Sequence, residues 1–313
     1  MERKSDSKLI ENLFRKRDLL LAGNDDHKQI RPVLLILGGG MRGASGIGAV
    51  YALHLLGLQD VFDVVVGIST GAGISACFLS GEETARRGAA IYYEDLAQGF
   101  IDVMRDPITD IDFVERVVRT GRKRVDPEAI HSARSEFFVC VTDHHDVTPV
   151  LLDAKRATPD IITAVKASMA IPGFYNRTVQ VNGRQYVDGS VNPFPIRRVL
   201  ELFNPTDMLV IANCTEESGR DREPNLIEKA LNLYFMRNVP NTLRTMWTSR
   251  YERWARGLAQ FRALTHVHTG ILWSPTQIEM LTSDPEKLRY ASERAVEETF
   301  RSFGQKPPAF SLL

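Results

Sequence analysis

Short runs of consecutive apolar residues alternate along the chain with longer stretches in which apolar residues recur every three or four positions. The short runs are typical of strands buried on both faces, and the longer stretches are typical of helices. The pattern predicts a strand over 33–37, a helix over 44–57, a strand over 62–66 and a helix over 70–79. Two successive strand–turn–helix units predict an α/β fold with three αβα layers, in which helices cover a doubly wound, mostly parallel sheet.

The alternation continues beyond residue 200 with no sign of a second core. We therefore expect one domain over 32–304, preceded by an amphipathic helix and linker over 1–31 and followed by a tail over 305–313. The further predicted elements are helical segments over 82–118 with a break near Pro107, strands over 137–142 and 147–152, a helix over 160–169, a hairpin over 179–187 that turns at Asn182-Gly183, a helix over 195–202, a strand over 208–212, a helix over 241–262, a strand over 268–273 and a helix over 285–303.

Two of these helical stretches, 7–22 and 241–262, place basic residues between their apolar positions. A basic amphipathic helix can lie on an anionic membrane surface, and it can also pack its apolar side on its own domain. Packing on the domain is the commoner arrangement. Peripheral membrane contact is the alternative that the sequence leaves open.

Composition narrows the function classes. The 313 residues include 39 Lys and Arg and 39 Asp and Glu, so the formal net charge is zero. The charge therefore does not indicate a nucleic-acid partner. The three cysteines lie in apolar contexts, which favours buried free thiols over disulfides or a metal site. The N-terminus carries charges where a signal peptide would be apolar, and no later run is long enough to cross a bilayer. A cytoplasmic protein is expected, and the sequence does not indicate its oligomeric state.

One serine stands between a predicted strand and a predicted helix, in Gly67-Ile68-Ser69-Thr70-Gly71. Glycines two positions before and after a serine fit a nucleophile elbow, a tight turn that lifts the serine oxygen clear of the sheet. The pentapeptide alone is a weak signal, because a glycine-rich turn can contain a serine by chance. Its meaning depends on the other motifs.

A glycine loop, Gly38-Gly39-Gly40-Met41-Arg42-Gly43, directly follows the first predicted strand. Its spacing matches the dinucleotide fingerprint, which also needs an acid at the end of the second strand. Asp60 and Asp63 fall before or at the start of that strand, the wrong end for this role. The loop lacks the Lys-Ser/Thr ending of a P-loop. The same geometry suits an oxyanion hole, in which backbone N–H groups stabilise a developing negative charge.

A base for the serine has two sets of candidates. The chain order of an α/β-hydrolase triad would pair Ser69 with Asp188 or Asp207 and then with His266 or His268. Asp188, however, lies in Asp188-Gly189-Ser190 immediately after a predicted strand, and this favours a different assignment.

The motifs GGGMRG, GISTG and DGS, in that order and each after a predicted strand, resemble the patatin-like phospholipase family and its bacterial members in particular. The segments 167–175 and 186–195 are also similar to the parts of the family around its catalytic aspartate. The resemblance runs from Val33 to about Ala212, and the later helices match weakly.

The resemblance implies that Ser69 is the nucleophile and Asp188 its general base, a dyad without histidine. It implies hydrolysis of phospholipid or lysophospholipid acyl esters through an acyl-enzyme, as in lipid degradation, with no metal or cofactor. Gly39, Gly40 and Met41 are the expected oxyanion donors. The oxyanion loop as a whole comprises Gly38, Gly39, Gly40, Met41, Arg42 and Gly43, and the supporting motif glycines are Gly67, Gly71 and Gly189.

Because a carboxylate is a weak base for a serine hydroxyl, we expect Asp188 to lie in a desolvated cleft that makes it more basic than in water. Arg42 matches the family's arginine, with a role in shaping the loop or in stabilising charge. Ser190, where many members have glycine or alanine, is a minor departure. Two alternatives remain: an esterase with a Ser-Asp-His triad, and a lipid- or nucleotide-binding module without turnover.

Overall fold

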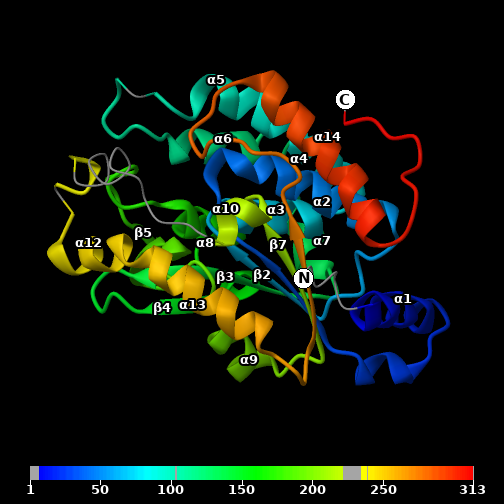
Figure 1. The fold of residues 1–313 in the computed structure, drawn as a ribbon. Coiled ribbons are helices and arrows are strands. Elements are labelled where there is room, and N and C mark those ends of the chain that lie inside the picture. The colour runs from blue at the N-terminus through cyan, green and yellow to red at the C-terminus, as the bar shows by residue number, and fades with distance from the viewer. Residues whose placement is uncertain (1–6, 103, 221–233, 238, 313) are drawn as a thin grey trace.

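The computed structural model describes residues 7–102, 104–220, 234–237 and 239–312. Within these ranges an eight-stranded sheet has the order β5-β6-β3-β2-β1-β7-β8, and β4 also pairs with β3 (Figure 1). Neighbours among β1, β2, β3, β7 and β8 are parallel, and β4, β5 and β6 pair in antiparallel fashion. The strands are β1 (Pro32–Ile36), β2 (Val64–Ile68), β3 (Glu136–Asp143), β4 (Pro149–Asp153), β5 (Val179–Val181), β6 (Arg184–Asp188), β7 (Asp207–Ala212) and β8 (His268–Trp273).

Helices cover both faces of this sheet, so the predicted three-layer αβα fold is confirmed (Figure 1). Side chains of β1 alternate between two cores: Leu34 and Ile36 belong to one, and Val33 and Leu35 to the other. Both cores bury β1 completely, which explains why its sequence reads as an uninterrupted apolar run. The first core contains α2 (Gly43–Leu55), α3 (Thr70–Leu79), α4 (Glu82–Ala90), α8 (Ile161–Met169) and α14 (Pro285–Ser302), and the second contains α9 (Ile196–Phe203) and α13 (Arg250–Arg262).

The predicted helical regions are subdivided more finely in the structure. The region 82–118 contains α4, a π-helical segment η3 (Ile91–Leu96), the short α5 (Ala97–Gly99) and α6 (Ile111–Arg119). The region 241–262 divides at Ser249 into α12 (Asn241–Thr248) and α13. Elements that the pattern did not predict are α7 (Pro127–Ser132), α10 (Glu216–Arg220) and the 3-10 turns η1 (Asp25–Gln29), η2 (Gly40–Arg42), η4 (Ala154–Arg156) and η5 (Gly189–Val191).

The N-terminal helix α1 (Ser7–Leu21) packs on the domain. Its Leu9 and Leu13 are fully buried, and the buried Lys16 ammonium donates to Asp63 Oδ2 (2.6 Å) and to the Ile30 carbonyl (2.7 Å). The apolar side of α13 is likewise buried in the second core. The apolar sides of both basic helices are thus used within the fold.

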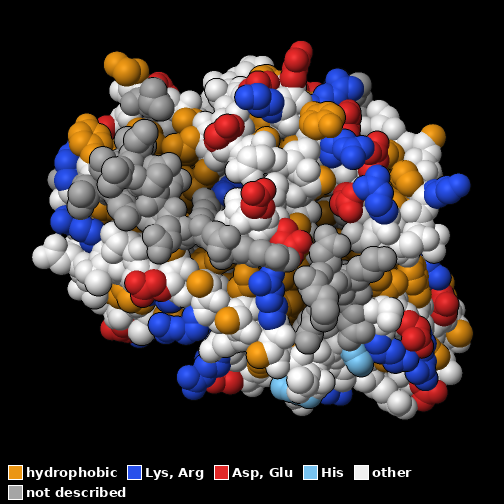
Figure 2. Space-filling model, viewed as in Figure 1, with side chains coloured by type: hydrophobic (Ala, Val, Ile, Leu, Met, Phe, Trp, Pro, Cys, Tyr) orange, Lys and Arg blue, Asp and Glu red, His pale blue; other side chains and the backbone are white. Residues whose placement is uncertain are grey.

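On the face shown in Figure 2, acidic and basic side chains are interspersed over the described residues, in keeping with the zero net charge. Among the described helices, none combines the length and apolarity that a membrane span requires.

Candidate active site

Ser69 occupies the sharp turn between β2 and α3. Its φ of 54° and ψ of −126° are strained for a residue with a side chain, as in a nucleophile elbow. The flanking glycines are required by close approach of the backbone. A Cβ on Gly71 would lie 2.2 Å from the Ile36 carbonyl oxygen, and a Cβ on Gly67 would lie 2.5 Å from Ala72 Cα. Local packing therefore fixes the turn that presents the serine.

Sheet register brings Asp188 next to this turn. The pairing of β2 with β3 ends at Ile68 opposite Cys140, and β6 pairs with the next position of β3, where Asp188 is opposite Val141. β4 pairs with β3 over a stretch that overlaps both of these pairings, so β4 occupies the opposite edge of β3. β2 and β6 consequently share one edge. Asp188 takes the place in the sheet that Ser69 leaves when the chain turns into α3.

The Asp188 carboxyl group is fully buried. Its Oδ1 accepts the Ser190 N–H at 2.6 Å, whereas its buried Oδ2 has no hydrogen-bond partner among the described residues. Burial raises the pKa of Asp188 to about 6, against the opposing influence of the Ser69 and Ser190 side chains. The Ser69 side chain is thus among the groups that lower the pKa of this carboxyl group. The expected desolvation of Asp188 and the direction of its pKa are confirmed.

The glycine loop closes the third side of this site. A Cβ on Gly38 would lie 3.2 Å from Ser69 Cβ and 3.0 Å from Ser190 Oγ, so the three sequence motifs meet at this glycine. The buried Arg42 donates its Nε–H to the Gly39 carbonyl oxygen (3.1 Å). This bond braces the loop from within, which supports the loop-shaping role among the two considered for Arg42.

The backbone N–H groups of the loop differ in availability. Met41 donates to the Met280 carbonyl oxygen (3.0 Å), and Arg42 and Gly43 donate to carbonyl groups of the loop itself. The N–H groups of residues 38–40 have no acceptor within the described part of the chain. In this conformation the N–H of Met41, one of the three expected donors, is already engaged.

Two buried polar residues support the site without having been predicted. Ser168 Oγ accepts the Ser69 N–H (2.9 Å) and donates to the Cys140 carbonyl oxygen (2.6 Å), which ties the elbow to β3. Asn213 Nδ2 donates to the Leu37 carbonyl oxygen (2.6 Å) at the start of the glycine loop. A polar residue directly after a buried strand was the available signal for Asn213. No sequence signal separated Ser168 from an ordinary helix serine.

The candidate residues of the alternative triad and of the dinucleotide site lie at or before the amino ends of the parallel strands. His268 and Asp207 begin the parallel strands β8 and β7, whereas Ser69 follows the end of β2. A strand of this length spans about 17 Å, so neither His268 nor the preceding His266 reaches the serine, and the triad reading is wrong. Asp63 precedes β2 and binds Lys16, so it lies far from the glycine loop, which follows the end of β1. It is therefore not placed to bind the ribose of a dinucleotide held by that loop.

Comparisons with known proteins found a curated relative and solved structures that are similar to this chain. An uncharacterized protein of Escherichia coli (strain K12), YjjU, is 25% identical over 233 residues, which cover 72% of this chain and 57% of that protein. The chain thus spans little more than half the length of this curated relative. Among solved structures, VipD from Legionella pneumophila matches 88% of this chain and 67% of its own (11% identity, TM-score 0.38). The type III effector ExoU matches 87% of this chain and 53% of its own (15% identity, TM-score 0.39).

A family model for patatin-like phospholipase matches residues 34–200, more than half of the chain. The matched range includes the glycine loop, the elbow and Asp188. The chain belongs to the patatin-like phospholipase family.

Proposed function

We propose that this protein is a serine acyl hydrolase that cleaves acyl esters of phospholipids or lysophospholipids through a Ser69–Asp188 dyad. One observation carries the proposal: Ser69, on its strained turn, lies between the loop at Gly38 and a fully buried carboxyl group that has a free oxygen atom. Membership of a family of lipid acyl hydrolases supports the same reaction class.

In the proposed reaction, Asp188 Oδ2 accepts the Ser69 proton while Oγ attacks the ester carbonyl carbon. The N–H groups of Gly39 and Gly40 stabilise the oxyanion, and loss of one such donor typically slows a reaction by a factor of about 100 to 1,000. Asp188 then protonates the departing alcohol. A water molecule then attacks the acyl-enzyme and gives a proton to Asp188, and Asp188 passes this proton to the departing Ser69 Oγ as the carboxylic acid is released.

The raised pKa of Asp188 fits this role. With a pKa of about 6 the group is mostly ionised at neutral pH, yet it is a stronger base than an ordinary aspartate. Activity requires the ionised form, so kcat/KM should rise as the pH increases through about 6 and level off above it.

The test is hydrolysis of a panel of phospholipids, lysophospholipids and p-nitrophenyl esters by the wild type, Ser69→Ala and Asp188→Asn. We expect both variants to lose activity, and a fluorophosphonate to label the wild type but not Ser69→Ala. His268→Ala, altered at the opposite edge of the sheet, is the control and should hydrolyse normally. A folded wild-type protein that neither hydrolyses any ester nor reacts with the probe would be a binding module, and the proposal would be rejected.

A further inference from the structure

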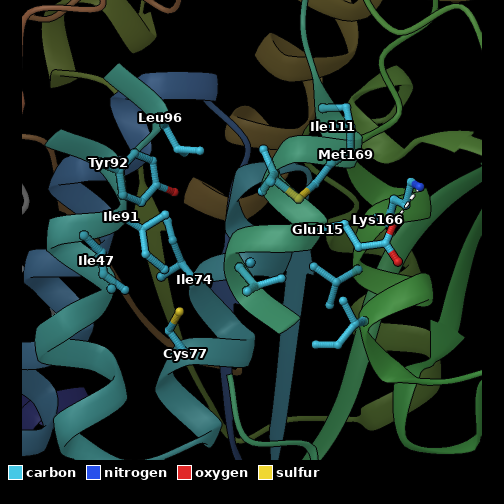
Figure 3. Close-up of a pocket in the computed structure, with 16 residues that line it drawn as sticks. Ile47, Ile74, Cys77, Ile91, Tyr92, Leu96, Ile111, Glu115, Lys166 and Met169 are labelled. Carbon is cyan, nitrogen blue, oxygen red and sulfur yellow. Dashed lines mark hydrogen bonds and ion pairs between the residues drawn. The ribbon is translucent and has the colours of Figure 1, made fainter. Parts of the chain in front are cut away.

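An apolar cavity lies beside α3, between α6, α8 and the π-helical segment η3 (Figure 3). Its lining includes Gly73 and Cys77 of α3 and Met169 of α8. The two charged residues of the lining, Glu115 and Lys166, form an ion pair with a separation of 2.6 Å. These charges neutralise each other, so the lining favours a neutral, apolar ligand.

The cavity starts close to the serine nucleophile. Thr70, the residue after Ser69, has its Oγ1 2.5 Å from the hydroxyl oxygen of Tyr92, which is in the lining. Met169, also in the lining, directly follows Ser168, whose hydroxyl accepts the Ser69 N–H. From both sides, therefore, the cavity wall is continuous with the groups that hold the nucleophile.

Gly73 leaves a gap in this wall one helical turn beyond Ser69. A Cβ at Gly73 would find only Met169 Cε and Sδ, both at 4.0 Å, which is ordinary contact. Gly71 differs, because its missing side chain is imposed by the Ile36 carbonyl oxygen. Glycine weakens a helix relative to alanine, and packing gives no reason for it at position 73. Its effect is to leave space between α3 and the Met169 side chain.

We propose that this cavity binds the acyl chain of the ester that Ser69 attacks, and that it selects chains of medium length. The inference rests on the proposed function. Figure 3 shows Met169 toward one end of the cavity lining, and Cys77 with Ile47 at the opposite end. Cys77 lies eight residues after Ser69, about 12 Å along the helix axis, a distance matched by an extended chain of about eight to ten carbon atoms.

The mostly apolar lining suits an unbranched hydrocarbon chain. The Met169 side chain, which is flexible and unbranched, can adjust to an entering chain.

The wild-type protein gives the first test, with p-nitrophenyl esters from acetyl to palmitoyl assayed as monomers. Each buried methylene should increase kcat/KM about fourfold up to about eight carbon atoms. Beyond about ten carbon atoms kcat/KM should level off or fall. A continued rise from decanoyl to palmitoyl esters would overturn the proposed selection of medium-length chains.

Gly73→Leu gives the second test, because the new side chain would project into the space before Met169. Exclusion of three methylenes should reduce the octanoyl-to-acetyl ratio of kcat/KM by about 60-fold. Gly73→Ala should reduce the ratio less. Ala259→Leu, which adds the same side chain on the exposed surface of α13, is the matched control and should keep the wild-type ratio. An unchanged ratio in folded Gly73→Leu would contradict the proposal.

A binding measurement separates this inference from the proposed function. Ser69→Ala should be stabilised against heat by methyl octanoate more than by methyl acetate, and the added Gly73→Leu substitution should remove the difference. If the wild type hydrolyses no ester but this difference appears, the proposed function fails and the apolar chain site stands. If hydrolysis occurs and neither the binding difference nor the chain-length optimum appears, the cavity proposal alone fails.

Discussion

Replacing Asp188 by asparagine should slow turnover by about 100- to 10,000-fold and at the same time make the protein more stable. The carboxyl group is fully buried, and its pKa is raised from 3.8 to about 6. A shift of about two pH units corresponds to about 3 kcal/mol of folding free energy at pH 8. Asparagine fills the same space without charge, its side-chain oxygen can accept the Ser190 N–H, and its amide can donate to Ser69. The variant thus avoids the cost of burying an ionised group.

The sign of the effect depends on pH. Because folding raises the pKa of Asp188, the wild type bears no penalty below about pH 3.8, an increasing penalty between about pH 3.8 and 6, and a constant one above. The stability advantage of Asp188→Asn should therefore grow by about 1.5 kcal/mol between pH 5 and pH 8. At pH 8 a gain of about 3 kcal/mol should raise the Tm by about 6 °C for a chain of this size.

Urea unfolding of the wild type and Asp188→Asn at pH 5, 6.5 and 8 measures the difference directly, and ester hydrolysis on the same samples should show a loss of about 100- to 10,000-fold. Asp207→Asn is the matched control. Asp207 is also fully buried, but it begins β7, and it accepts from Asn12 Nδ2 (2.8 Å) and Thr206 Oγ1 (2.6 Å). Asp207→Asn should lose stability and keep its activity. An Asp188→Asn protein that is less stable than the wild type at pH 8, or equally stabilised at pH 5 and 8, would refute the reasoning.

Three further predictions test the supports of the site and its surroundings. Ser168→Ala leaves the Ser69 N–H without its acceptor, so kcat should fall about tenfold and urea unfolding should show a loss of about 1–3 kcal/mol; an unaltered kcat would mean that the bond does not position the elbow. His268→Ala should retain more than half of the wild-type kcat/KM, and loss of turnover in the folded variant would revive the triad. Lys16→Ala removes a buried cation from Asp63, which keeps its ion pair with Arg134 (2.8 Å), and leaves the Ile30 carbonyl oxygen without its donor, so it should cost about 1–3 kcal/mol of stability with kcat/KM unchanged; a Tm equal to that of the wild type would show that the Lys16 contacts are dispensable.

The sequence predicted the strands and helices around the site because each is specified locally. The apolar run before Gly38 indicates a doubly covered strand, and Asn182-Gly183 indicates the turn of the β5–β6 hairpin, where both residues have positive φ. The ends of the helices inside the region 82–118 were harder to predict from the sequence. There, η3 continues directly from α4, so apolar spacing alone showed no boundary.

The contacts across the site needed the three-dimensional structure. The motifs predicted that Ser69 and Asp188 each lie at a turn after a strand. No local pattern, however, predicted that β6 would pair with β3 beside the end of β2. The same holds for Met280, whose carbonyl oxygen engages the Met41 N–H from a loop almost 240 residues later. Long-range pairing of this kind leaves little trace in a single sequence, because the residues involved follow no common periodicity.

A short side chain can serve as the sole base only if its backbone comes very close to the nucleophile. The carboxylate of an aspartate extends little beyond its Cβ, whereas a histidine placed between the serine and the aspartate would bridge a wider gap. In this fold β6 supplies the close approach: a Cβ on Gly189 would lie 2.1 Å from the Cys140 carbonyl oxygen, so the turn after Asp188 packs directly against β3. The Thr142 hydroxyl fixes the same turn by donating to the Asp188 carbonyl oxygen (2.9 Å). The absence of a side chain at Gly189 and the end of β2 at Ile68 therefore act together, and they make a two-residue mechanism geometrically feasible without His266 or His268, which lie at or before the amino end of β8.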